Sequence, residues 1–247
     1  MIVRDRGDSW QVVLQTDHAD LAAAFARAWA DHDERDDSLV LATERHDDGW
    51  AVWERAPLVE PETGKPINFL DVGVPAHLTF YRACIAAVSD QDPYAGLLVS
   101  MHGAGIYRQR YGTDLALSLT RAPEVAEQVE EFVAEQEASH PGRLASTGHS
   151  DEERWTDYHR LQLYDRLSLY FCMRDVENGE PWEIGDYRLV PLEPWRMTID
   201  PYPFDVSPAR FSLLRRLVPK RARTQREFPA ELFALAPEQV EITVQRG

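Results

Sequence analysis

The sequence predicts a mainly α protein, a helical bundle with a small antiparallel β appendage formed by an N-terminal hairpin and C-terminal strands. Apolar residues recur at helical spacing through much of residues 16–175, and short β-rich runs follow residue 180. No internal repeat or low-complexity linker divides the 247 residues. We therefore expect a single domain over 1–247, with a helical body at about 16–175 and an appendage at about 180–247 that the hairpin 1–15 joins.

Local signals place the elements in order. Strand-like residues 2–4 and 10–14 flank a turn of suitable composition. Asp17 can cap a first helix, and Asp37 or Ser38 can cap a second that ends before Gly49. The next stretch contains four prolines and predicts a long ordered loop, a kind of segment that tends to carry function. This loop spans residues 50–75, further helices are expected at about 76–90, 94–111, 121–138 and 151–174, and strands at 187–190, 195–199, 211–218 and 240–244.

Composition excludes several classes of protein. The net charge is 26 − 42 = −16, so the surface repels nucleic acid and anionic membranes. No apolar run approaches the roughly 20 residues of a membrane helix, and the first eleven residues lack the apolar core of a signal peptide. Cys84 and Cys172 are too few for a disulfide framework or a Cys-rich zinc site. We expect a soluble, cytoplasmic protein that binds neither nucleic acid nor membranes.

One segment departs from the acidic trend. Between Arg210 and Arg226 the chain holds seven cations and no carboxylate. Such a run is usually a solvated strand or loop that pairs with acidic neighbours. The alternative is an anion site or a docking patch, and the sequence leaves both open.

Histidines and aspartates on the predicted helices are the candidates for chemistry. His18 lies in the first helix, the pair His46-Asp47 closes the second, His102 lies in the fourth, and Asp165 lies in the last long one. Imidazole nitrogens and carboxylate oxygens that point inward from separate helices can hold a metal ion. Each residue alone has a simpler explanation: a hydrogen-bonded histidine, a chance His-Asp dipeptide, or an aspartate paired with Arg166.

The chain resembles a bacterial family of uncharacterised proteins, domain of unknown function 3891. The ordered His … His-Asp … Asp set is also similar to the metal-binding signature of the HD-domain superfamily, which contains phosphohydrolases, phosphodiesterases and some di-iron oxygenases. The string around His46 is the most specific. The matching strings are Met1-Ile2-Val3-Arg4, Gln15-Thr16-Asp17-His18, Glu44-Arg45-His46-Asp47-Asp48-Gly49-Trp50, Thr63-Gly64-Lys65-Pro66, Ser100-Met101-His102 and Asp165-Arg166-Leu167-Ser168-Leu169-Tyr170.

This resemblance implies an HD-like bundle in which one metal ion has the ligands His18, His46, Asp47 and Asp165. It implies a second-ion role for His102, with His77 as a poorer candidate for that role. Many catalytic members of the superfamily carry a lysine four residues after the histidine of the pair. Here that position is Trp50, for which Arg45 or Lys65 are the possible replacements.

The expected function is that of an HD-like metal-dependent hydrolase of a small phosphorylated metabolite or nucleotide. Ligation without cysteine favours Mn, Fe, Co or Ni over Zn and allows Mg, as one ion or two. Asp48, Arg45 and Lys65 are the expected catalytic residues, although Asp48 is equally a plain helix-end carboxylate and Lys65 an exposed turn residue. The expected partner is a small anionic substrate, and a homodimer stays open. The alternatives are a di-iron oxygenase and a non-catalytic scaffold that binds a ligand or partner.

Overall fold

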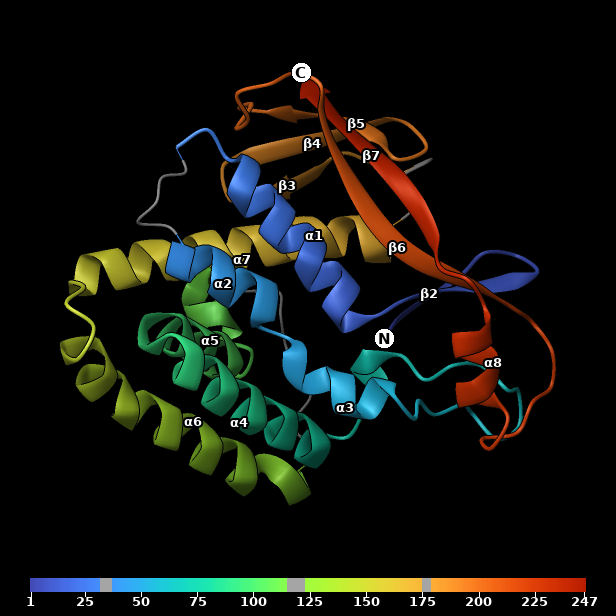
Figure 1. Ribbon diagram of the computed structural model, residues 1–247, viewed down its shortest axis with the longest axis horizontal. Helices are drawn as coiled ribbons and strands as arrows, with labels where there is room; N and C mark the ends of the chain where they lie inside the picture. Colours follow the sequence, from blue (N-terminus) through green and yellow to red (C-terminus); the bar gives the residue numbers. More distant parts are fainter. Residues whose placement is uncertain (32–36, 115–122, 175–178) are drawn as a thin grey trace.

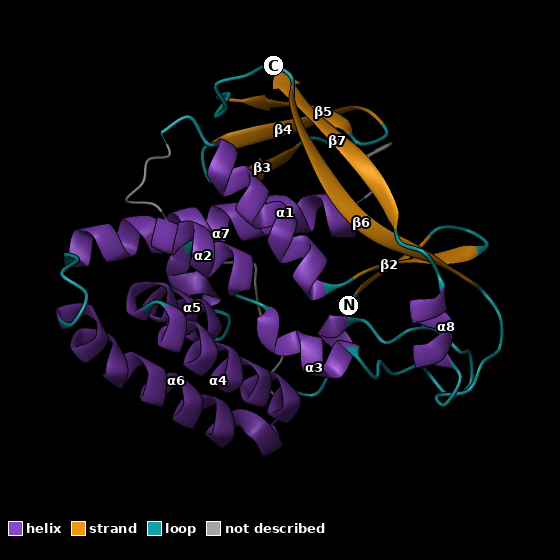
Figure 2. Cartoon of the chain, in the orientation of Figure 1, coloured by secondary structure: helices purple, strands orange, loops and turns teal. Residues whose placement is uncertain are grey.

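The computed structural model describes residues 1–31, 37–114, 123–174 and 179–247. Within these residues, seven strands form one mixed sheet in the order β1-β2-β6-β7-β5-β4-β3, curled into a half-barrel (Figure 2). The neighbouring strands run antiparallel except β5 and β7, which are parallel. The strands are β1 Ile2–Asp5, β2 Ser9–Val13, β3 Trp182–Ile184, β4 Tyr187–Glu193, β5 Arg196–Asp200, β6 Ala209–Pro219 and β7 Glu238–Arg246.

Most helices lie on one side of this sheet, whereas α8 stands apart from them and packs against Met1, Val3 and Val12 at the β1-β2 end (Figure 1). In the described part of the chain, 3₁₀ turns at Asp48–Trp50, Phe69–Asp71 and Gln109–Gly112 connect some of the helices. The helices are α1 Gln15–Ala28, α2 Asp37–Arg45, α3 Ala51–Glu54, α4 Val74–Gln91, α5 Pro93–Gly105, α6 Pro123–Ala145, α7 Asp151–Met173 and α8 Phe228–Ala234.

Helix α1 lies between the sheet and the other helices and packs against α2, α7 and β6 (Figure 1). Its Phe25 ring lies 4.6 Å from the ring of Phe211 in β6 and 5.8 Å from the ring of Phe171 in α7. Residues 209–214 of β6 are alternately buried and exposed, as in a strand with one covered face. One contiguous apolar cluster therefore includes side chains of both the helices and the sheet.

Helix α5 is the central helix of the helical layer. Twelve of its thirteen residues, Tyr94 to Gly105, are buried, as expected for a helix with apolar neighbours on every side. Gly96 and Gly105 allow this packing, because a Cβ at Gly96 would lie 2.1 Å from Ser89 Oγ and one at Gly105 would lie 2.2 Å from the Tyr158 hydroxyl. This environment places His102 in the interior.

The predicted fold class, a mainly α HD-like or all-α bundle with a small antiparallel appendage, is wrong. The described residues are 53% helix and 21% strand, and the large mixed sheet shares the core with the helices. The predicted union of the N-terminal hairpin with the C-terminal strands is present, through the pairing of β2 with β6. The sequence prediction missed β3 and α8. It also did not predict that strands about 200 residues apart in the chain pair within one large sheet.

Most predicted helices are present with shifted ends. The expected long loop at 50–75 contains α3 and the 3₁₀ turn Phe69–Asp71. Helix α7 starts with a capping box in which Ser150 and Glu153 bond each other's backbone N–H groups. Residues 121–122 of the predicted helix 121–138 lie outside the described residues. Among the described helices, none is long and apolar enough to cross a membrane.

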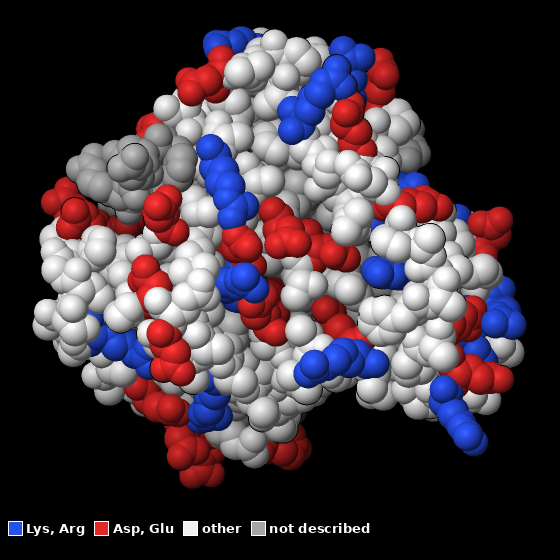
Figure 3. Space-filling view, in the orientation of Figure 1, with Lys and Arg blue, Asp and Glu red and all other residues white. Residues whose placement is uncertain are grey.

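The cationic segment between Arg210 and Arg226 is largely neutralised by carboxylates. Six of its seven cations form ion pairs with carboxylates of β1, α1, β7 or α8. Cationic and acidic side chains accordingly lie beside each other on the face shown in Figure 3. These pairs favour a strand that pairs with acidic neighbours over a docking patch.

Candidate metal centre

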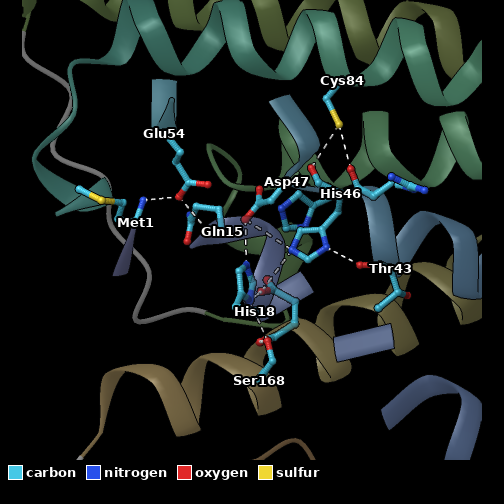
Figure 4. Close-up of polar contacts among 12 residues, drawn as sticks. Met1, Gln15, His18, Thr43, His46, Asp47, Glu54, Cys84 and Ser168 are labelled. Carbon is cyan, nitrogen blue, oxygen red and sulfur yellow. Dashed lines mark hydrogen bonds and ion pairs between the residues drawn. The ribbon is translucent and has the colours of Figure 1, made fainter. Parts of the chain in front are cut away.

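Four helices bring the predicted ligands together inside the protein. His18 comes from α1, His46 and Asp47 from the end of α2, His102 from α5 and Asp165 from α7, and all five are buried. In the described chain they form two overlapping groups, His18–His46–Asp165 and His46–Asp47–His102. Within each group the possible ligand atoms lie within 4.8 Å of one another. The imidazoles of His18 and His46 converge on Asp47 (Figure 4).

The hydrogen bonds of His18 orient a lone pair toward Asp47. The Ser168 hydroxyl donates to the Asp165 carbonyl at 2.8 Å, so the same hydroxyl oxygen accepts a hydrogen bond from His18 Nδ1–H, also at 2.8 Å. His18 Nε2 lies 2.9 Å from Asp47 Oδ2. Two acceptor atoms at this distance repel each other unless a proton or a metal ion lies between them.

His46 is oriented in the same way. Its Nδ1–H donates to the Thr43 carbonyl at 2.7 Å, which leaves the Nε2 lone pair inside the site. This buried Nε2 has no hydrogen-bond partner among the described residues and lies 3.6 Å from both Asp47 Oδ2 and Asp165 Oδ1. Ligand atoms at about 2.1 Å from an ion lie roughly 3.0–3.4 Å apart. These separations are therefore close to those of a coordination shell.

The charges of the cluster depend on one another. Burial opposes the charged form of His46, but Asp47 and Asp165 outweigh burial and raise its pKa to about 9. Burial likewise opposes the ionised form of both carboxylates. Arg110 and His46 nevertheless hold the pKa of Asp165 well below its usual value, and His46 and His18 do the same for the pKa of Asp47. A cation between imidazoles and carboxylates stabilises the cluster, and a metal ion competes with the proton for that place.

Two further side chains orient the carboxylates. The Tyr81 hydroxyl donates to Asp47 Oδ1 at 3.0 Å, and Arg110 Nη1 donates to Asp165 Oδ2 at 2.5 Å. Each carboxylate therefore has one oxygen bonded to an outer group and the other oxygen directed at the histidines. This arrangement is common in metal sites, where outer hydrogen bonds fix the direction of the ligands.

The sequence prediction missed Ser168, Gln162 and Arg110, and it considered Tyr81 only as an aromatic residue that could line a pocket. Gln162 and Ser168 lie three residues on either side of Asp165, so helical spacing alone places them on its face of α7. For Arg110 there is no such signal. It reaches Asp165 from a 3₁₀ segment in which three consecutive non-glycine residues have φ between 50° and 52°, a left-handed conformation that side chains disfavour.

His102 and His77 differ from the other two histidines. Burial lowers the pKa of His102 to about 3 and that of His77 to about 4, so both are neutral at pH 7. Gln162 Nε2 lies 3.1 Å from His102 Nδ1. His77 packs its ring 4.6 Å from that of Trp50 and belongs to neither candidate metal group.

The cluster lies at a cavity of about 980 Å³. Its walls include His18, Asp47, His102, Arg110 and Asp165, and apolar side chains of the 69–75 segment and α7 form much of the remainder. The structure does not bring the three predicted catalytic residues to this cavity. Arg45 and Asp48 pair with each other at 3.1 Å, and Lys65 pairs with Glu60 at 3.0 Å, in each case on partly exposed side chains.

The family model described as protein of unknown function DUF3891 matches residues 1–220. The chain belongs to this family. Comparisons with curated proteins and with solved structures find no match. The expected resemblance to the HD superfamily has no support from these comparisons. The buried His/Asp groups of this DUF3891 member can hold a metal ion, and the chemistry of the donor atoms fits a divalent cation.

Proposed function

We propose that this DUF3891 protein is a metal-dependent hydrolase of a small anionic substrate, a phosphorylated metabolite or nucleotide. One observation carries the proposal: the Nε2 lone pairs of His18 and His46 are directed at the carboxylates of Asp47 and Asp165 in the wall of a large cavity. A proton or a metal ion between these atoms stabilises the arrangement, and the cavity offers space for a substrate beside it.

The ligands of the proposed ion are two imidazole nitrogens and two carboxylate oxygens, from His18, His46, Asp47 and Asp165. A nitrogen and oxygen set without thiolate favours Mn, Fe, Co or Ni over a structural zinc. When bound, such an ion supplies Lewis acidity and makes water a nucleophile at neutral pH. Tyr81 and Arg110 hold the two carboxylates in orientation throughout.

The charges around the cavity support an anionic substrate. Among the described lining residues there are three arginines and four aspartates, a sum of −1, which becomes +1 with a divalent ion. Arg110 and Arg166 are already paired with Asp165 and Asp114, whereas the exposed Arg174 lies over the ring of Trp182 at 4.5 Å. We therefore expect an anion to bind only when the ion is present.

The test combines metal content with phosphate release. Elemental analysis of untagged protein should give about one equivalent of a transition metal, lost in the double variant His46→Ala/Asp47→Ala. Release of phosphate from a panel of phosphomonoesters and nucleotides should fall to background in the same variant. The matched control is His159→Ala, which removes an exposed histidine of the same helix as Asp165 and should change neither result.

Two outcomes contradict the proposal. Metal that stays bound in the double variant would mean that the site lies elsewhere. Iron with oxygen uptake and no phosphate release would replace hydrolysis by the oxygenase alternative.

A further inference from the structure

Four side chains form a continuous hydrogen-bonded chain from one carboxylate of the cluster to His102. Arg110 Nη1 donates to both Asp165 Oδ2 and Gln162 Oε1, and Gln162 Nε2 lies 3.1 Å from His102 Nδ1. All four residues are buried, and three of them, His102, Arg110 and Asp165, line the cavity. The direction of each bond in this chain determines which ring nitrogen of His102 carries the proton.

The direction is set at Arg110. A guanidinium has donors and no acceptor, so the Gln162 atom that faces it is the carbonyl oxygen. The amide nitrogen of Gln162 is then the atom that faces His102, and an amide nitrogen only donates. His102 Nδ1 must accept this bond, and an imidazole that accepts at Nδ1 carries its proton at Nε2.

His102 is therefore the opposite tautomer of His18 and His46. Those two rings donate from Nδ1 to Ser168 and to the Thr43 carbonyl and direct lone pairs into the site. His102 keeps its lone pair for Gln162 and has an N–H at Nε2, the ring nitrogen that is left for the contents of the cavity it lines.

We propose that His102 is not a metal ligand but a hydrogen-bond donor that binds an oxygen of the anionic substrate through Nε2–H. This inference rests on the proposed function and adds the group that recognises the substrate oxygen. A neutral imidazole donor polarises such an oxygen without giving up its proton.

The proposal also sets the number of ions. His46 belongs to both candidate groups, but it has a single free lone pair, at Nε2. It can therefore serve one ion only. With His102 as a donor, the second group loses two of its three members, and the centre holds one ion.

The first experiment separates metal binding from anion binding. Titration calorimetry with Mn²⁺ should give one site of unchanged affinity in His102→Leu. Inorganic phosphate, titrated into the Mn²⁺-loaded protein, should bind about 10- to 100-fold more weakly to this variant, the effect of one lost hydrogen bond to an anion. His102→Gln, whose amide N–H₂ replaces the Nε2–H donor, should keep most of the phosphate affinity.

The second experiment observes the tautomer. In ¹⁵N NMR of histidine-labelled protein, the signal missing in His102→Gln identifies His102 and should show Nε2–H. Gln162→Glu presents an acceptor oxygen to Nδ1 in nearly the same shape, so it should switch the ring to Nδ1–H and weaken phosphate binding.

The two proposals fail separately. If His46→Leu keeps its metal, the proposed metal centre is wrong. If His46→Leu loses the metal and His102→Leu loses it as well, the centre stands and His102 is a ligand. An Nδ1–H signal for His102 in the unmodified protein overturns the donor role directly.

Discussion

At the scale of single residues, the partner of each imidazole determines its chemistry. His18, His46 and His102 have the same side chain, so the sequence alone does not distinguish their roles. Their Nδ1 atoms contact a serine hydroxyl, a backbone carbonyl and a glutamine amide, respectively. The first two partners accept a hydrogen bond and the third donates one, so the proposed roles differ, with two rings as metal ligands and one as a donor.

Tyr81 offers a prediction at this scale. Its hydroxyl donates to Asp47 Oδ1, and both groups are buried. Tyr81→Phe removes this bond with little change of shape and frees Asp47 to rotate away from the histidines. We expect about tenfold weaker binding of Mn²⁺ by titration calorimetry, the lower end of the range for outer groups of metal sites.

The matched control is Tyr94→Phe. The Tyr94 hydroxyl makes the same kind of bond, at 2.8 Å to Asp157, but neither residue lines the cavity. Equal loss of metal affinity in the two variants would show that a general loss of stability, and not the orientation of Asp47, is responsible.

At the scale of elements, the buried helix α5 carries polar groups that need partners from its neighbours. Ser100 donates to Gln136 Oε1 at 2.9 Å and accepts from His140 Nε2 at 3.0 Å, both on α6. This small network joins the two helices behind His102. Because His140 is buried there, its pKa falls to about 4.

This interface predicts a pH dependence of stability. The pKa of His140 is lower in the folded protein than the ordinary value of 6.5, so the unfolded chain binds the extra proton between pH 6.5 and pH 4. The stabilisation is complete above pH 6.5 and declines as the pH falls toward 4. From pH 7 to pH 5 the loss should be about 2 kcal/mol, at about 1.4 kcal/mol per pKa unit.

Urea unfolding at pH 7 and pH 5, with His140→Gln as the comparison, measures this contribution. Glutamine retains a donor and does not titrate, so the variant should lose about 2 kcal/mol less than the unmodified protein over this interval. Other buried histidines titrate equally in both proteins and cancel. Identical pH dependence of the two proteins would contradict the assignment.

At the scale of the whole molecule, α1 connects the two layers. It supplies His18 to the metal centre and Phe25 to the shared core, where the phenyl ring meets Phe211 of the sheet and Phe171 of α7. The sheet and the helices therefore depend on the same buried surface. We expect them to unfold together.

Phe25→Ala tests this dependence. Removal of a fully buried phenyl ring should lower the free energy of unfolding by about 3–5 kcal/mol, and Phe25→Leu should lower it less. Urea transitions followed by circular dichroism and by tryptophan fluorescence should coincide in each protein. Separate transitions, with helices that persist after the sheet is lost, would show two independent units.

Prediction from the sequence succeeded where the signal was local. The N-terminal hairpin and most of the helices agree with the structure, and His18, His46, Asp47 and Asp165 lie in two overlapping buried groups that could hold a metal ion. Prediction failed for the sheet, because the pairing of β2 with β6 joins residues about 200 positions apart. It also placed Asp48 near the chemistry because it follows the metal pair in sequence, and Arg45 and Lys65 as replacements for a missing lysine, whereas in the structure these residues lie in partly exposed ion pairs.

Residue types and helical patterns in the sequence indicated which helices carry the histidines and aspartates, and the resemblance to the HD-domain signature singled out His18, His46, Asp47 and Asp165 among them. What each of these residues contacts depends on the folded chain. Arg110 reaches Asp165 across 55 positions, and Gln162 reaches His102 across 60. Hydrogen-bond direction depends on partners that are distant in the chain, so the donor and the ligands among the histidines separate only after folding.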